Sequence, residues 1–234
     1  MTALRFPGIL LLAGVLSLAG CVRYQQAPLY QLDSGDIRVP AAAQGIAVLL
    51  GPVAIADYLQ REALLQRQAD GSLTAAENAS WAGSLASDID QQLVRQLASR
   101  LNSQRLVLAP TTAGFVPQVR LGLSITRLDS GPQRPAVLEA QWRLAGADGK
   151  LLDGRLVHLE EGHNGSIVDQ VRAQSLVVQQ LVEQLAAAVE TQSMPAPKAP
   201  APARKPAPVK PEPPVPPRIP VVEPMRGESE VFRF

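Results

Sequence analysis

Cysteine, histidine and aromatic residues are scarce in this chain, and each shortage excludes a class of protein. The 234 residues include one cysteine and two histidines, which excludes a disulfide framework and argues against a Cys/His metal site. Aromatic residues make up 4% of the sequence, so the core must be built from aliphatic side chains. We therefore expect a fold that rests on hydrophobic packing alone, with no metal and no cofactor.

Net charge and long apolar runs are lacking as well. The formal charge is +1 at pH 7, which gives no electrostatic reason to expect binding to nucleic acid. The apolar run at residues 9–18 is about half as long as a membrane-spanning helix, which needs roughly 20 residues. A short run of this kind after a charged residue, here Arg5, is typical of a signal peptide.

The lone cysteine closes this N-terminal segment. Leu18-Ala19-Gly20-Cys21 resembles a bacterial lipobox, in which the cysteine thiol is diacylated and its freed amine is then acylated. We therefore predict cleavage between Gly20 and Cys21 and lipidation of Cys21; an ordinary signal peptide and a mitochondrial presequence are the alternatives. Several acyl chains anchor a protein stably, because each buried methylene contributes about 0.8 kcal/mol. Val22 follows instead of Asp, which favours sorting to the outer membrane.

Strands are predicted in the first part of the mature chain. Residues 28–32 alternate between apolar and polar side chains and predict a first strand. Residues 45–55 form an apolar run that predicts a strand buried on both faces and interrupted at Pro52, which has no N–H to donate. Asp70-Gly71 is a turn signal that predicts a hairpin between residues 64–68 and 73–76.

Two amphipathic helices are expected. The first covers about residues 81–101, because apolar residues recur there at every fourth position: Trp81, Leu85, Ile89, Leu93, Leu97 and Leu101. A helix on a membrane surface is the alternative, but such a helix would carry Lys and Arg where Asp and Gln are as frequent here. The second helix begins at a capping box of Ser166 and Asp169 and continues to about residue 189.

Alternating segments between the helices predict further strands, at about residues 106–108, 119–126, 136–144 and 150–159. This order of elements predicts an α+β two-layer sandwich, with a mostly antiparallel sheet and both helices on one face. The predicted segments are a signal peptide (1–20), a tether (21–27), the folded domain (28–192) and a C-terminal tail (193–234).

The tail is rich in proline. Residues 193–234 hold 13 of the 21 prolines and cannot bury a core, so we expect a disordered segment that samples polyproline II. Five basic residues and one acidic residue lie between positions 198 and 218. The tail is therefore either a passive spacer or a contact to anionic peptidoglycan.

Several motifs resemble those of the paraquat-inducible protein C (PqiC) lipoproteins, also called ABC-type transport auxiliary lipoproteins. They are Tyr30-Gln31-Leu32, Val48-Leu49-Leu50-Gly51-Pro52-Val53, Asp57-Tyr58-Leu59-Gln60-Arg61 and Trp81. The resemblance covers about residues 16–190. Ala56 stands where the family usually has Pro, and Gly83-Ser84 where Glu-Pro is common.

The resemblance implies an outer-membrane lipoprotein that faces the periplasm. Its implied partners are an MCE-domain (PqiB-like) protein and either a PqiA-like integral membrane protein or an ABC transporter. The implied process is transfer of phospholipid or another hydrophobic molecule between the membranes. Self-association and contact with peptidoglycan are further expectations, and a structural lipoprotein bound to peptidoglycan is the alternative function.

Two sets of residues are candidates for a site. Asp57, Tyr58 and Leu59 follow a buried strand at a turn and are predicted to dock the partner, although a purely structural turn is an equal alternative. His158 and His163 lack a Ser, Cys or carboxylate partner at a recognisable catalytic spacing, and Glu160-Glu161 fits a solvated strand end. The sequence therefore argues against catalysis.

Overall fold

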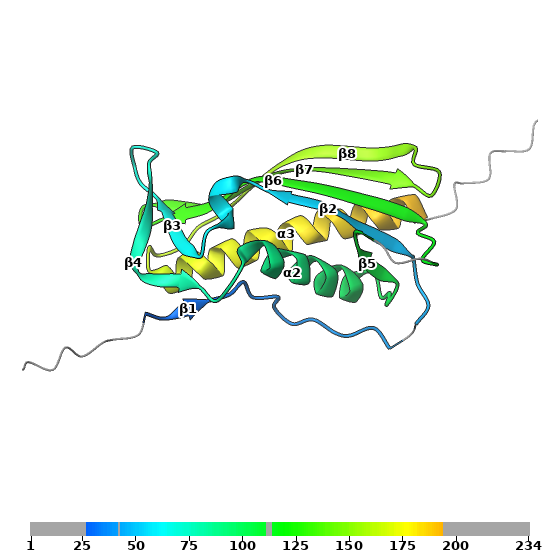
Figure 1. The fold of residues 1–234 in the computed structure, drawn as a ribbon, viewed down its shortest axis with the longest axis horizontal. Helices are drawn as coiled ribbons and strands as arrows, with labels where there is room; N and C mark the ends of the chain where they lie inside the picture. Colours follow the sequence, from blue (N-terminus) through cyan, green and yellow to red (C-terminus); the bar gives the residue numbers. More distant parts are fainter. Residues whose placement is uncertain (1–26, 42, 111–113, 194–234) are drawn as a thin grey trace, which may run out of the picture. The chain divides into compact units, whose positions relative to one another are not determined.

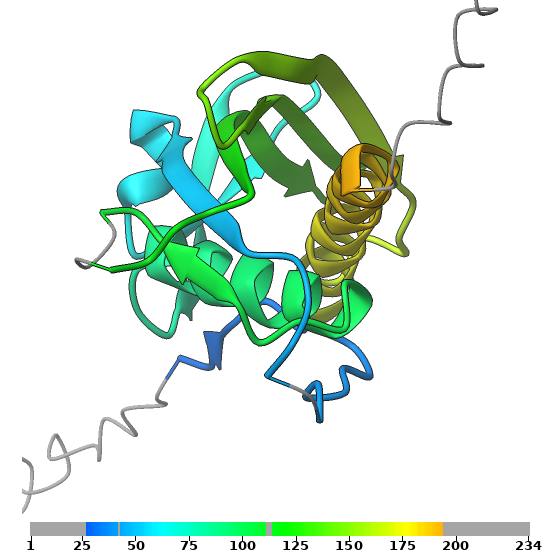
Figure 2. The same ribbon diagram turned by 90° about the vertical axis from the view of Figure 1, so that its right-hand side faces the viewer.

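The structure, a computed structural model, describes residues 27–41, 43–110 and 114–193. Within these ranges eight strands form one mixed sheet, and two long helices cover one of its faces (Figure 1). Viewed from the end, the sheet curves around these helices (Figure 2). The predicted α+β sandwich is confirmed. Cys21 and the proline-rich tail lie outside the described ranges.

The strands follow the order β1-β4-β3-β6-β2-β5, with β7 paired to β6 and β8 paired to β7. The strands are β1 (Leu29–Tyr30), β2 (Val48–Ile55), β3 (Ala63–Arg67), β4 (Leu73–Trp81), β5 (Leu106–Leu108), β6 (Val119–Gly131), β7 (Arg134–Gly146) and β8 (Leu151–Glu161). The helices are the 3₁₀ helix η1 (Asp57–Gln60) and the α-helices α2 (Leu85–Arg100) and α3 (Ile167–Ser193).

The two longest ladders, β6-β7 and β7-β8, are antiparallel as predicted, and so is the β3-β4 hairpin, in which Arg67 pairs with Leu73. The parallel pairs, which the sequence pattern did not reveal, join β2 to β5 and β6, β1 to β4, and β3 to β6. The two pairs of β2 arise because this strand enters the sheet between β6 and β5.

The core lies between the sheet and the two helices and is aliphatic. The predicted stripe of α2 is buried at Leu85, Ile89, Leu93 and Leu97, and that of α3 at Val171, Val178, Val182, Leu185 and Val189. The predicted capping box is present in part: the Asp169 N–H donates to Ser166 Oγ at 3.2 Å, but the Asp169 carboxylate accepts from the Ser166 hydroxyl at 2.9 Å, because the Ser166 N–H donates to Asn164. The first backbone N–H groups of a helix have no partner within it, so the bond from the Asp169 N–H to Ser166 fixes where α3 begins.

The predicted start of the first long helix is wrong by about one turn. Trp81 is the last residue of β4, where its N–H donates to the Glu62 carbonyl at 2.8 Å. The helix begins only at Leu85, because Ser84 caps it by accepting from the Ser87 N–H at 3.4 Å. Trp81 and Leu85 are both buried, so their spacing of four residues imitated a helical turn across the strand–helix junction.

Strand β2 is interrupted near Pro52, as predicted, but only half of it is buried on both faces. Val48, Leu49 and Leu50 are buried, and the register against β6 then shifts between Leu50 and Val53. Beyond the shift the exposure alternates, because that part of the strand leads to the surface turn at η1. Among the described helices, none is both long and apolar enough to cross a membrane.

Candidate functional site

The turn predicted to dock a partner fills a gap along one edge of β6. Strand β2 pairs with β6 up to Ile125, and β3 takes over the same edge at Ser130. Between them the Tyr58 hydroxyl accepts a hydrogen bond from the Leu128 N–H at 3.1 Å. The side chain of Tyr58 thus replaces the missing strand, which holds η1 against the sheet.

A cluster of charged residues around Asp129 binds the hydroxyl of Tyr58. Tyr58 donates its hydroxyl proton to Asp129 Oδ2 at 3.1 Å. Two guanidinium nitrogens of Arg67 donate to the same carboxylate at 2.6 and 2.9 Å, and Arg127 Nε donates at 3.1 Å. The Asp129 side chain is 1% exposed, whereas the two arginines keep partial contact with solvent. A buried carboxylate that accepts from three residues fixes the orientation of their donor groups.

Glycine at position 131 allows this arrangement. A Cβ atom there would lie 1.9 Å from the Arg67 carbonyl oxygen, so any side chain would push β3 away from β6. Because Arg67 ends β3, that displacement would withdraw its guanidinium from Asp129.

The cluster shifts the pKa values of its members. Burial alone would raise the pKa of Asp129, but the hydrogen bonds of Arg67 and the charge of Arg127 outweigh burial and hold it below its usual value. Burial is the main cause that raises the pKa of Tyr58 to about 12, and the charge of Asp129 adds to it. The folded state therefore favours an ionised Asp129 and a neutral Tyr58.

These shifts predict a loss of stability at both extremes of pH. Because the pKa of Asp129 is lower in the folded state, its contribution is present above about pH 4 and is lost as the pH falls through the folded value. Because the pKa of Tyr58 is raised to about 12, its contribution is lost as the pH rises from about 10 to 12. Urea unfolding between pH 9 and 12 checks this, since Tyr58→Phe should flatten the alkaline decline; equal slopes in the variant and the wild type would contradict it.

The three predicted docking residues have different environments. Leu59 is buried in the core, and Tyr58 is half-buried with its hydroxyl bound inward. The space behind them is about 10 Å³, room for about one water molecule, so the turn is packed. Asp57 is exposed, and its carboxylate accepts only a long bond of 3.4 Å from Gln60 Nε2. Asp57 is therefore the residue of the three that is free to meet another molecule.

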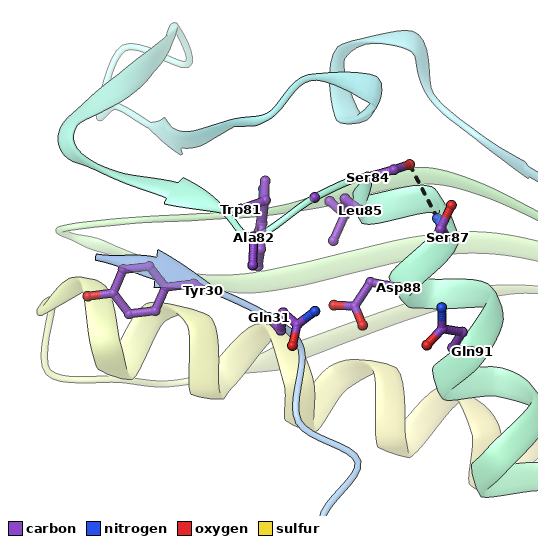
Figure 3. A pocket seen from close by; sticks show the side chains of 10 residues that line it. Tyr30, Gln31, Trp81, Ala82, Ser84, Leu85, Ser87, Asp88 and Gln91 are labelled. Atoms are coloured by element: carbon purple, nitrogen blue, oxygen red, sulfur yellow. Dashed lines mark hydrogen bonds between the residues drawn. The ribbon is translucent and has the colours of Figure 1, made fainter. Parts of the chain in front are cut away.

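A recess lies on the other side of the buried pair Trp81 and Leu85. It measures about 180 Å³ and opens between β1 and the first turns of α2, with Tyr30 and Gln31 on one side and Asp88 and Gln91 on the other (Figure 3). Pockets that bind small molecules usually measure about 300–1,000 Å³. The recess is too small for a lipid.

His158 contacts two glutamates on the surface of the sheet, and His163 hydrogen-bonds to the backbone. His158 Nε2 is 2.9 Å from Glu160 and its Nδ1 is 3.3 Å from Glu139, on the exposed face of the sheet, and Glu160 is the main cause that raises the pKa of His158. His163 Nδ1 accepts from the Gly165 N–H at 2.9 Å, which leaves Nε2 to donate to the Arg134 carbonyl at 2.8 Å. In the described part of the chain, no group of three or more His, Cys, Asp and Glu residues is arranged to hold a metal.

Sequence reasoning missed the cluster beneath Tyr58. Its one signal is Asp129, a charged residue at a position of β6 whose neighbours are all buried. A second missed feature is a row of polar residues on α2: Asp88, Gln92, Gln96 and Ser99. Gln92 and Gln96 are only 1% exposed, so this row does not face solvent.

Comparison with known proteins agrees with this fold. The sequence model of a family described as "ABC-type transport auxiliary lipoprotein component" matches residues 30–186. A crystal structure of a protein described as uncharacterized aligns with a TM-score of 0.57 and 22% identity, over 70% of this chain and 99% of that one. A DUF330 protein from Xanthomonas campestris aligns with a TM-score of 0.57 and 16% identity, over 72% and 100%. No curated protein matches the chain.

Proposed function

Because the chain belongs to the family of ABC-type transport auxiliary lipoproteins, we propose that it is a non-catalytic part of an MCE-type system that moves lipid between two membranes. In this proposal Cys21 carries the acyl chains that hold the domain at the outer membrane, facing the periplasm. The domain would work there with an MCE-domain protein and with a PqiA-like protein or an ABC transporter.

The observation that carries the proposal is the extent of the family match. Residues 30–186 run from β1 into α3, so the match includes strands β2 to β8, the η1 turn, all of α2 and most of α3. The recess beside β1 is too small to enclose a lipid, so the proposal places no cargo site there.

Within this role we assign docking to the surface around η1. Asp57 is exposed there on a turn whose neighbours, Tyr58 and Leu59, are fixed to the sheet and the core. A rigid turn with a free carboxylate loses little conformational freedom when a partner binds, so it suits recognition of a basic surface.

Replacement of the lipidated residue tests the anchoring. Cys21→Ala should leave an unprocessed precursor that does not fractionate with the outer membrane, because neither acylation nor lipobox cleavage can proceed without the thiol. Ser17→Ala, a change upstream of the lipobox, is the matched control and should be processed and sorted like the wild type. Normal processing and sorting of Cys21→Ala would overturn the assignment.

A further inference from the structure

The segment between β1 and β2 crosses the outer side of the helix pair. After β1 the chain runs along α2, so the two helices lie between this segment and the sheet (Figures 1 and 2). We call residues 29–40 the strap. Apart from the two residues of β1 it has no regular secondary structure, and of its side chains only Leu32 and Pro40 are buried.

Side chains of both helices hold the backbone of the strap. From α2, Asp88 accepts from the Leu32 N–H at 2.8 Å, and Gln92 Nε2 donates to the Leu32 carbonyl at 2.6 Å. From α3, Ser175 Oγ accepts from the Asp33 N–H at 2.9 Å, and Gln179 Nε2 donates to the Asp33 carbonyl at 2.9 Å.

The contacts continue toward the C-terminal end of α2. Ser99 Oγ accepts from the Arg38 N–H at 3.0 Å, and Gln104 Nε2 donates to the Pro40 carbonyl at 2.5 Å. Asp88, Gln92 and Ser99 fall on one face of α2, as Ser175 and Gln179 do on α3. The floor of the groove between the helices is therefore made of amides, hydroxyls and a carboxylate that match an extended peptide backbone.

We propose that this groove is a reversible binding site for the chain's own strap, and that the strap detaches as a unit while the rest of the domain stays folded. Detachment exchanges hydrogen bonds to side chains for hydrogen bonds to water, and such an exchange has a small net effect. It takes one side chain, Leu32, out of the hydrophobic core and uncovers the half-buried Tyr30, while most other side chains of the strap are exposed already.

A recess lies beside the end of the strap that is nearest the predicted anchor. The recess of about 180 Å³ lies between Tyr30 and Gln31 of the strap and residues of α2, and β1 pairs with β4 over only two residues. A pull from the N-terminal side would therefore begin to peel the strap at this recess.

With Cys21 lipidated as proposed, detachment of the strap would also lengthen the link between the domain and the membrane; this consequence rests on the proposed function. An extended chain spans at most about 3.3–3.6 Å per residue, so residues 22–28 reach about 25 Å. With the strap released, residues 22–40 reach about 65 Å. Detachment would then set how far the domain can move from the membrane that anchors it.

Amide hydrogen exchange of the lipidated mature protein in detergent micelles tests the binding site. The amides of Leu32, Asp33 and Arg38 should exchange at least 100-fold more slowly than in an unfolded chain. They should also exchange at least 100-fold faster than the amides of β6 and β7. Exchange at the rate of the β6 and β7 amides would show that the strap opens only when the domain unfolds, and absence of protection would show that it is not bound; either result overturns the proposal.

Two neighbouring glutamines of α3 provide a matched pair of variants. Gln179→Ala removes the bond to the Asp33 carbonyl, whereas Gln180→Ala removes a bond to Glu161 outside the strap. The first should speed exchange of the Leu32 and Asp33 amides about fivefold and leave β6 unchanged, and the second should leave the strap amides unchanged. Equal effects of the two variants on the strap would contradict the proposal.

A disulfide lock tests the consequence for reach. Asp33→Cys with Ser175→Cys places two thiols where the Asp33 backbone now meets the Ser175 side chain. The oxidised pair should slow exchange of the Leu32 amide at least tenfold, and its reduction should increase the distance between a supported bilayer and the domain. An unchanged Leu32 rate in the oxidised form would overturn reversible release. A domain that never binds the bilayer would contradict lipidation alone, because the exchange experiments can be repeated on the mature chain without acyl groups.

Discussion

Replacement of Asp129 by alanine should lower the stability of the domain by about 3 kcal/mol, which corresponds to roughly 6–12 °C in the unfolding midpoint of a domain of this size. The carboxylate is 1% exposed and accepts from Arg67, Arg127 and Tyr58. Its loss leaves two guanidinium groups close together without their shared acceptor. Because both arginines reach solvent in part, we expect the lower end of the range that is usual for a broken buried ion pair.

An exposed ion pair on the same sheet gives the control. Asp153 and Arg155 on β8 are 3.5 Å apart, and the side chain of Arg155 is 68% exposed. Asp153→Ala should therefore change stability by less than about 1 kcal/mol. Thermal unfolding followed by circular dichroism measures both variants. An Asp129→Ala midpoint equal to that of Asp153→Ala would show that the cluster does not hold the η1 turn.

Reversal of the charge at Asp57 should abolish co-purification with the proposed MCE-domain partner and leave stability unchanged. Asp57→Lys places a positive charge where the docking proposal needs a negative one, and like charges across an interface disfavour binding by several kcal/mol. The side chain is exposed and bound only by a long contact to Gln60, so the unfolding midpoint should stay within about 1 °C.

Glu77→Lys is the matched control for this change. Glu77 is an exposed carboxylate on β4, and its replacement alters the net charge by the same amount at a place outside the η1 surface. It should leave co-purification intact. Survival of the complex with Asp57→Lys, or its loss with both variants, would contradict docking through η1.

Much of the fold could be predicted because its longest elements have simple periods. The alternation of Leu121, Leu123 and Ile125 against polar neighbours indicated the meander, and the apolar spacing along α2 and α3 indicated the helices. Trp81 misled the helix boundary because a buried strand end and a buried helix start happened to lie four residues apart. The parallel pairing of β2 with β6 joins segments about 70 residues apart, which no local pattern encodes.

The site was harder to predict for the same reason. Asp129 meets Arg67 and Tyr58 across 62 and 71 residues of sequence, so the cluster exists only once the sheet has formed. The row at Asp88, Gln92 and Ser99 resembled a solvated helix face, because a stripe of amides that binds a backbone has the composition of a surface. Only the hydrogen bonds from these side chains to the strap show that the row binds a backbone and does not face solvent.

The proposal that the chain works with an MCE-domain protein is tested most directly by the wild-type sample of the Asp57 experiment. The tagged native chain is crosslinked in intact cells, purified from the outer-membrane fraction, and the attached proteins are identified by mass spectrometry. The account predicts an MCE-domain protein among them, lost in Asp57→Lys and retained in Glu77→Lys. Recovery of peptidoglycan fragments without any MCE-domain protein would contradict the account and favour the structural lipoprotein as the function.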